Sequence, residues 1–375
     1  MKPQDSDARP TDVAPGFNNV EASEAGPSPD VKKEATSPKF SRKKILSLGV
    51  VLALLVATGG GLFWHSRHSA TKTVPLTKIS VQLEWVNNPE FSGMYVAQDL
   101  GYYRAAGLDV TLKEFQDTTD VNQDLANGKA DFGVSTPLEV ILGRDKGQKT
   151  KAIAAIYQTS AYAIASPKTA NIKTPSDFKG KILGNSGDNN QAKVTYAALI
   201  ANAGLTPDQT TIKTVDLDLI KVFNEKQADT YDLYRTDQTY LLDKANIPYN
   251  QIFPEEYGLN IYGDVLSASD SKITQNPAQV QSFVQATMRG WQYAIDHQPQ
   301  TLAILAKHDN VLYKDPAYVK FDLTNTAPLI RPTGGQSLGS MEFVPWNRAY
   351  QAVQTAGLIK TGFDVSDAYT SEFVK

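Results

Sequence analysis

The sequence predicts an α/β fold for the region from about residue 77 to the C-terminus. The first observation is that short apolar, β-rich runs alternate there with longer amphipathic runs. Short strands that alternate with helices form a mostly parallel sheet covered by helices on its faces. The second observation is the length of 375 residues, which is enough for a sizeable core and suggests two domains or one large one.

The elements follow from the period of the apolar positions. The predicted strands are residues 79–83, 108–115, 132–134, 151–157, 162–165, 181–184, 212–215, 230–234, 251–253 and 265–268. The predicted helices include residues 91–103, 120–127, 138–146, 191–203, 218–225, 278–297, 299–306, 317–325, 341–356 and 365–373. In the longest helix, one buried face at the helical period is expected at Val280, Phe283, Val284, Thr287, Met288, Trp291 and Ile295.

Composition excludes several classes of function. Lys and Arg number 37 against 40 Asp and Glu, so the balance of charge does not suggest a nucleic-acid partner. The sequence has no cysteine, which removes disulfides, thiolate metal sites, cysteine nucleophiles and a lipid-anchored cysteine. Its 4 histidines have no metal-ligand spacing, and no phosphate-binding glycine motif occurs, so neither a metal nor a cofactor is predicted.

The N-terminal region predicts a membrane anchor. Residues 1–43 are polar and are expected to form a disordered cytoplasmic tail. Residues 45–64 carry no charge over roughly the 20 residues that a spanning helix needs, so 44–64 are assigned as a single transmembrane helix. Arg42, Lys43 and Lys44 precede it, which places the N-terminus inside and the remainder outside the membrane. A cleavable signal peptide is the alternative, and residues 65–76 would be a polar linker in either case.

Ligands of such sheets bind where strands end at their carboxyl edge, and two exits in the first half of the domain carry suitable residues. In residues 83–89, Trp85 would stack on a planar ring and Asn88 would hydrogen-bond it. The alternative is a core tryptophan beside a helix-capping asparagine. In residues 133–139, the hydroxyls of Ser135 and Thr136 would cap a helix, contact a ligand, or do both.

Two further exits lie later in the chain. Residues 184–190 are rich in Gly and Asn, which suits close approach of the backbone to a ligand, although a plain turn explains them too. Residues 228–237 crowd Tyr231, Tyr234, Arg235 and three carboxylates into one strand and its exit. A solvated surface strand would explain the charges there better than it explains the two tyrosines.

These regions, in this order, carry a resemblance to a known family. Residues 83–112 (LEWVNNPEFSGMYVAQDLGYYRAAGLDVTL) resemble the opening of NMT1/THI5-like substrate-binding proteins. The family includes pyrimidine-precursor binders of ABC importers and is related to sulfonate, taurine and nitrate binders. The resemblance continues through residues 127–147, 153–166, 172–184 and 276–299 and covers nearly all of 77–375.

The resemblance implies a two-lobed type II periplasmic-binding-protein fold. The solute-binding domain would be residues 77–375, with lobe one at 77–165 and 265–375 and lobe two at 166–264. Residues 162–166 and 265–268 would be the strands that cross between the lobes. The family further implies a small-molecule ligand between the lobes, an ABC permease and ATPase as partners, and an extracytoplasmic location at the cell membrane.

The ligand and its contacts are also expected from the resemblance. The ring-binding pair of the family matches Trp85 and Asn88, and the inter-lobe aromatic position matches Tyr234. Pyrimidine binders usually have His where this chain has Phe91, and THI5-like synthases need that His and a cysteine-rich motif, so no enzyme is expected. The ligand-binding residues predicted in all are Trp85, Asn88, Phe91, Ser135, Thr136, Asn185, Gly187, Asp188, Tyr234 and Arg235.

The ligand class stays open between alternatives. A small planar heterocycle such as a thiamine pyrimidine precursor is the first, and an aliphatic sulfonate, taurine or a nitrate-like anion is the second. Arg235 would supply charge for an anionic group. A tethered ligand-sensing domain that is not coupled to transport is the third alternative.

Overall fold

The structure, a computed structural model, describes residues 75–374. The predicted tail, the predicted anchor at 44–64 and nearly all of the predicted linker lie outside the described residues. Within residues 75–374, no helix is both long enough and apolar enough to cross a membrane.

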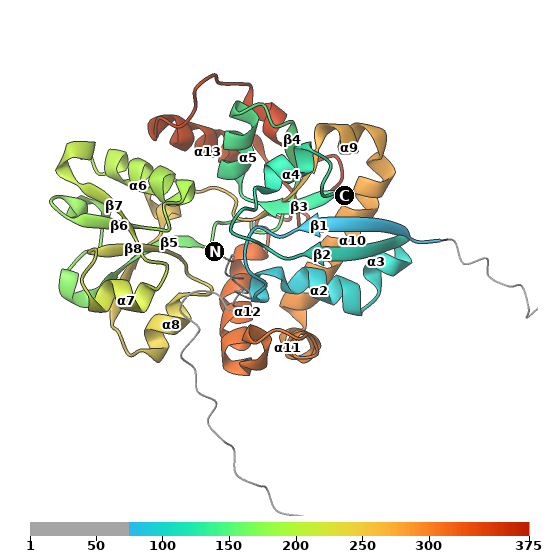
Figure 1. Cartoon of the computed structure of the whole chain (residues 1–375), viewed down its shortest axis with the longest axis horizontal. Coiled ribbons are helices and arrows are strands. Elements are labelled where there is room, and N and C mark those ends of the chain that lie inside the picture. The colour runs from blue at the N-terminus through green and yellow to red at the C-terminus, as the bar shows by residue number, and fades with distance from the viewer. Residues whose placement is uncertain (1–74, 375) are drawn as a thin grey trace, which may run out of the picture. The chain divides into compact units, whose positions relative to one another are not determined.

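The described chain contains two five-stranded sheets (Figure 1). The first sheet has the order β2-β1-β3-β10-β4, with β1 Thr77–Gln82, β2 Leu108–Lys113, β3 Phe132–Ser135, β4 Thr150–Ala155 and β10 Val265–Ser269. The second sheet has the order β7-β6-β8-β5-β9, with β5 Tyr162–Pro167, β6 Ile182–Ser186, β7 Thr211–Val215, β8 Thr230–Tyr234 and β9 Tyr249–Ile252. The predicted strands therefore all occur, with ends that differ by a few residues.

The expectation of mostly parallel strands is confirmed, because in each sheet four strands run in one direction and a single strand, β10 or β5, runs against them. β1 is parallel to β2 and β3, and β6 is parallel to β7 and β8. In contrast, β10 is antiparallel to β3 and β4, and β5 is antiparallel to β8 and β9. The chain reaches β5 from the first sheet and β10 from the second sheet. Each of these strands therefore enters its sheet at the end opposite to the one where its neighbours begin, and it runs against them.

The chain crosses between the sheets twice. All of β5 pairs within the second sheet, so the first crossing falls at residues 156–161 rather than at the expected boundary after 165. The second crossing falls at residues 253–264, before β10. Residues that follow strands of both sheets are thereby brought to a common region.

Helices cover both faces of each sheet. They are α2 Ser92–Asp99, α3 Tyr102–Ala105, α4 Val121–Ala126, α5 Pro137–Asp145, α6 Asn190–Asn202, α7 Leu219–Asn224, α8 Thr239–Lys244, α9 Asp270–Gln275, α10 Pro277–Asp296, α11 Gln298–Leu305, α12 Pro316–Ile330 and α13 Phe343–Thr355. The 3-10 turns are η1 Pro89–Phe91, η2 Lys168–Ala170, η3 Pro175–Phe178, η4 Pro207–Gln209, η5 Pro254–Tyr257, η6 Leu312–Lys314 and η7 Val365–Ala368. In the second sheet, the core on one face includes residues of α6 and the core on the other includes residues of α7.

Three helix predictions differ from the structure. The helix predicted at 91–103 is divided into η1, α2 and α3, because Gly101 adopts a left-handed conformation with φ of 72° between α2 and α3. The helix predicted at 365–373 is only the turn η7, because Tyr369 is extended, bridges to Ala152 and stacks on Trp346 at 5.2 Å. The short helices α8 and α9 were not predicted.

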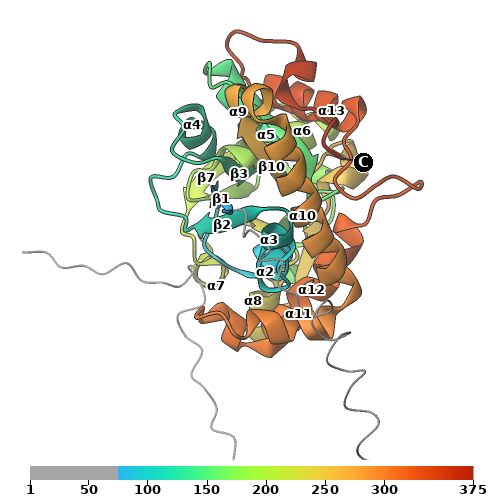
Figure 2. The ribbon, with the colours of Figure 1, turned by 90° about the vertical axis from the view of Figure 1, so that its right-hand side faces the viewer.

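The helix α10 packs closely against α2, and Figure 2 shows α10 beside α2 and α3. The whole predicted apolar face of α10 is buried, including Trp291 at 0% exposure. Glycines permit the close approach. A Cβ added at Gly290 would lie 2.1 Å from the carbonyl oxygen of Gly93, and one added at Gly93 would lie 2.3 Å from the Trp291 ring.

Gly290→Ala is expected to destabilise the protein by roughly 1–3 kcal/mol. The added methyl group overlaps backbone, and the strain outweighs the gain of about 1 kcal/mol in helix propensity. Gln285→Ala, at an exposed position of the same helix, is the matched control and should stay within about 0.5 kcal/mol of wild type. Urea unfolding measures both, and equal stabilities of the two variants would contradict the proposed close contact.

Candidate functional site

A cavity of about 470 Å³ lies at the ends of strands from both sheets. From the first sheet, the residues after β1 and β3 contribute Glu84, Trp85 and Thr136. From the second sheet, the residues at the ends of β6 and β8 contribute Gly187 and Tyr234. The four predicted strand exits thus all contribute to one cavity.

A second hollow of about 740 Å³ is larger but differs in character. It runs along α6 and β7 and reaches the end of α13, and it is lined mostly by small and apolar side chains. Asn185 and Asp188 line this hollow and not the cavity at the strand ends. We take the smaller cavity as the candidate site because aromatic rings and polar groups from both sheets converge on it.

Aromatic side chains form the walls of the cavity. The ring of Trp85 lies 5.2 Å from that of Phe115, and the ring of Tyr162 lies 5.8 Å from that of Tyr234, nearly perpendicular to it. All four residues line the cavity, as does Tyr231. Trp85 and Tyr234 are only partly buried, so ring surface is left for a ligand.

Asn88 and Phe91 lie behind this wall. The Asn88 side chain is buried and accepts a hydrogen bond from the Glu90 backbone N–H at 2.9 Å, which caps η1. Phe91 is 1% exposed and belongs to the main core. Neither residue lines the cavity.

The hydroxyl groups of Ser135 and Thr136, at the end of β3, have different contacts. Thr136 lines the cavity and caps α5, with its Oγ1 accepting from the Glu139 backbone N–H at 3.3 Å. Ser135 is buried, and its Oγ accepts from the Asn122 side chain at 3.4 Å. Capping and cavity lining are therefore compatible at Thr136, while Ser135 contacts other protein groups.

Asp232 orders the glycine-rich loop after β6. Its carboxylate accepts from the backbone N–H and the hydroxyl of Ser186 at 2.7 and 2.8 Å, from the Asn189 side chain at 2.9 Å, and from the Tyr162 hydroxyl. Burial raises the pKa of Asp232, and these hydrogen bonds oppose that rise. Gly187 then faces the cavity, whereas Asp188 is exposed and pairs with Lys193 at 3.0 Å.

Arg235 is directed away from the cavity. Its guanidinium pairs with Glu255 at 2.7 Å, donates to the Ser160 carbonyl at 3.3 Å and lies 4.6 Å from the centre of the Phe253 ring. Arg235 does not line the cavity, and the described residues that line it include no Lys, Arg or His. Residues 75–374 therefore provide the cavity with no cationic side chain to meet an anionic group.

Carboxyl groups are instead abundant at the cavity. Glu84, Glu90, Glu139, Asp232 and Asp237 line it. Burial raises the pKa of Glu84 and of Glu90 well above the usual range, and neighbouring carboxyls raise both further. Burial likewise raises the pKa of Glu139, which Lys146 partly offsets.

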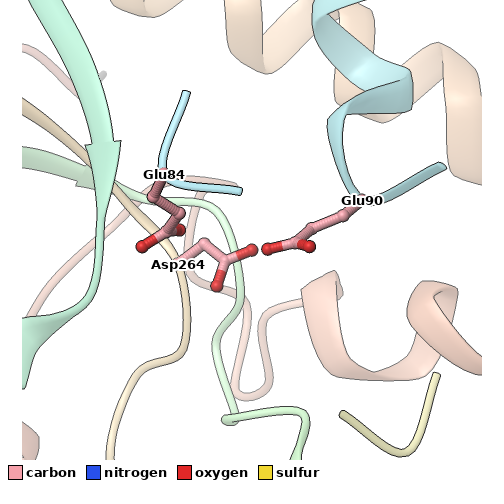
Figure 3. A group of neighbouring side chains, drawn as sticks. All are labelled: Glu84, Glu90 and Asp264. Atoms are coloured by element: carbon pink, nitrogen blue, oxygen red, sulfur yellow. The ribbon is translucent and has the colours of Figure 1, made fainter. Parts of the chain in front are cut away.

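Asp264, just before β10, joins this group. It is 1% exposed, and one oxygen from each of Glu84, Glu90 and Asp264 lies within 4.8 Å of the others. Figure 3 shows the Asp264 carboxylate between those of Glu84 and Glu90. This separation would also allow the three groups to ligate a metal ion.

No local pattern in the sequence singles out this acidic cluster. Glu84 and Glu90 flank the Trp85 region, but Asp264 is distant in sequence and meets them only through the second crossing. A faint signal existed, because Asp264 directly precedes the predicted crossing strand at 265–268.

Comparison with known proteins identifies the family and the fold. The family model described as NMT1/THI5 like matches residues 88–301, which confirms the resemblance found in the sequence. The alkanesulfonate-binding protein SsuA from Xanthomonas axonopodis pv. citri, solved bound to MOPS, has a TM-score of 0.61 at 16% identity. The match covers 79% of this chain and 98% of that one, so the two-sheet α/β fold of periplasmic binding proteins is confirmed.

Two relatives by sequence carry different functions. The riboflavin-binding protein RibY of Chloroflexus aurantiacus is 22% identical over 354 residues, covering 88% of this chain and 97% of that protein. The 4-amino-5-hydroxymethyl-2-methylpyrimidine phosphate synthase of Legionella pneumophila is 24% identical over 307 residues, covering 80% and 92%. This chain is therefore similar both to a binding protein and to a synthase.

Asp237→Asn is expected to gain stability over wild type as the pH rises. Burial raises the Asp237 pKa from 3.8 to about 6, so ionisation of Asp237 destabilises the folded protein increasingly between about pH 4 and pH 6. An asparagine at this position does not ionise, and its oxygen can still accept the 2.8 Å hydrogen bond from the Tyr318 hydroxyl.

Urea unfolding at pH 4 and pH 7.5 measures this effect. The stability of the variant minus that of wild type should rise by roughly 2–3 kcal/mol between the two pH values. A difference that is constant or that falls would show that Asp237 does not titrate as its burial requires.

Proposed function

We propose, from the premise that this chain belongs to the NMT1/THI5-like family, that it is the solute-binding protein of an ABC importer. It captures a small planar heterocycle in the cavity at the strand ends. The observation that carries this proposal is the placement of Trp85 and Tyr234, from different sheets, on the same cavity of about 470 Å³. Rings of this kind stack on planar ligands, and the volume suits a small molecule.

The aromatic walls favour a ring over an aliphatic anion. A sulfonate or nitrate-like ligand needs cationic or N–H donors, and the predicted candidate Arg235 is paired with Glu255 outside the cavity. Riboflavin is a planar heterocycle, so the similarity to a protein named for riboflavin binding supports the same choice. The pyrimidine ring of a thiamine precursor remains one member of this class.

Two features of the sequence support a binding function over a synthase activity. The chain has no cysteine at all, and Phe91 occupies the position where the resemblance implies a histidine. Phe91 is also buried in the core and is not in contact with the cavity. The chain therefore lacks the histidine and the cysteine-rich motif that the resemblance implies for a synthase, although one relative is named as a synthase.

The two lobes of the proposal are built around the two sheets. Hydrogen bonds already join them near the cavity, from the Tyr234 hydroxyl to Asp264 at 3.2 Å and from the Tyr318 hydroxyl to Asp237 at 2.8 Å. A ligand that contacts both sheets favours the closed population and would hold the lobes together. The closed form would then dock on a permease coupled to an ATPase.

The location in the proposal comes from the sequence alone. The uncharged run 45–64 and the basic residues before it support a single-pass anchor, with residues 1–43 cytoplasmic and 77–375 extracytoplasmic. Neighbouring genes for a permease and an ATPase would support transport. Neighbouring genes for a kinase or a transcription factor would favour the ligand-sensing alternative.

Thermal-shift screening with riboflavin, 4-amino-5-hydroxymethyl-2-methylpyrimidine and ethanesulfonate tests the proposal. A heterocycle should raise the Tm, since a ligand at about 100 times its Kd stabilises by about 2.7 kcal/mol. Trp85→Ala should weaken binding by about tenfold or more through the loss of ring contact. Phe343→Ala is the matched control, because Phe343 is 50% exposed and does not line the cavity.

Two results would contradict the proposal. One is stabilisation by ethanesulfonate alone, which would return the anion alternative. The other is heterocycle binding that Trp85→Ala and Phe343→Ala leave equally unchanged, which would place the ligand outside the cavity.

A further inference from the structure

The cavity holds more carboxyl groups than its surroundings could balance if all of them were ionised. Glu84 and Glu90 line it and lie close to the buried Asp264, while the lining residues in the described part of the chain include no Lys, Arg or His. Arg235, which follows the cavity residue Tyr234 in the sequence, is neutralised by Glu255. Carboxylates buried without a partner are costly, so this arrangement calls for a proton or an external cation.

Asp264 gives a second and separate indication of a missing partner. It is 1% exposed, and its Oδ1 accepts from the Tyr234 hydroxyl at 3.2 Å. Its Oδ2 and Oε1 of Glu84 are buried, and no N–H or hydroxyl group of the described chain donates to either atom. The Glu90 carboxyl also bonds to Asp264, which requires that one of the two groups hold a proton. Buried acceptors in folded proteins are nearly always satisfied, so donors from a ligand are the natural complement.

The three carboxyls point to a common place. Figure 3 shows the Asp264 carboxylate directed toward that of Glu90, with Glu84 on its other side. One oxygen of each lies within 4.8 Å of the others, which is the span that two or three N–H groups of one small cation can bridge. Glu84 and Glu90 line the cavity, and Asp264 lies between their carboxyl groups without lining the cavity itself.

We propose that the ligand is a planar organic cation whose N–H edge binds Glu84, Glu90 and Asp264. This inference rests on the proposed function and names the charge that its ligand carries. The positive edge forms charge-assisted hydrogen bonds to the carboxylates, and the ring contacts Trp85 and Tyr234. A cation next to aromatic faces gains further attraction from the ring electrons.

An organic cation fits the cavity better than a bare metal ion does. The volume of about 470 Å³ far exceeds what one ion fills, and aromatic side chains line much of the wall. The metal-like spacing involves only three of the carboxyls, while Glu139, Asp232 and Asp237 line other parts of the same cavity. A ligand with a ring and a charged edge accounts for both the aromatic side chains and the carboxyl groups that line the cavity.

Binding of such a cation releases protons. Without ligand, the crowded carboxyls retain protons in place of a counter-charge, and the arriving cation takes over that role. Each carboxyl that ionises on binding releases one proton to the solvent, so the affinity for a permanent cation rises with pH. A neutral ring has no such linkage.

The test compares benzamidine, benzamide and benzoate, which share one ring and differ in the charge of the substituent. Calorimetry on the full chain in two buffers of different ionisation enthalpy gives affinity and proton release together. Benzamidine should bind at least about tenfold more tightly than benzamide and release protons, and benzoate should bind least. Glu90→Gln and Glu84→Gln should each reduce the preference for benzamidine by about tenfold and leave benzamide unchanged.

Glu256→Gln is the matched control, because Glu256 is exposed and does not line the cavity. It should retain the full preference for benzamidine. Glutamine has the shape of the protonated acid, so both cavity variants are expected to fold, and circular dichroism checks this.

Three results would overturn the inference. They are benzamide or benzoate binding as tightly as benzamidine, no binding of benzamidine at millimolar concentration, and Mg²⁺, Ca²⁺ or Zn²⁺ binding that displaces benzamidine from the carboxyls. A neutral ring that binds and quenches Trp85 fluorescence, without any preference for the cation, would overturn this inference alone. The proposed function would then stand.

Discussion

The double passage of the chain between its two sheets determines the site. The connections before β5 and β10 carry the chain from one sheet to the other. As a result, the residues after β1 and β3 line the same cavity as those at the ends of β6 and β8. The same connections place Asp264, at the end of the second crossing, against Glu84 and Glu90. A cavity shared by two lobes lets one ligand contact both, and this is what couples binding to closure.

Some polar groups at the site bond to other protein groups, and others keep acceptor atoms that a ligand could use. Asp232 accepts hydrogen bonds from the glycine-rich loop and from the Tyr162 hydroxyl, and Arg235 is paired with Glu255. Within residues 75–374, Glu84 and Asp264 each keep a buried oxygen to which no N–H or hydroxyl group donates. Such unsatisfied groups cost stability in the empty protein, and proteins retain that cost mainly where a ligand later relieves it.

The sequence predicted the strands well because strand exits and apolar runs are local signals. It also predicted that Trp85, Thr136, Gly187 and Tyr234 would belong to one site, since they follow four strands at the carboxyl edge. It could not separate them from Asn88, Ser135 and Asn185, whose side chains bond to nearby protein groups. Which way a polar side chain turns depends on partners that composition and spacing do not reveal. The antiparallel direction of β5 and β10 and the meeting of Asp264 with Glu90 depend on contacts distant in sequence, and they escaped prediction for that reason.

The central claim is that a planar ring occupies the cavity at the strand ends. Native mass spectrometry of the full chain, purified from its own host in mild detergent, tests it most directly by weighing what is bound. We expect one small nitrogen heterocycle per chain, absorbing in the near ultraviolet and lost from the Trp85→Ala variant. A bound molecule without a ring, such as an aliphatic sulfonate, retained equally by wild type and Trp85→Ala, would contradict the account.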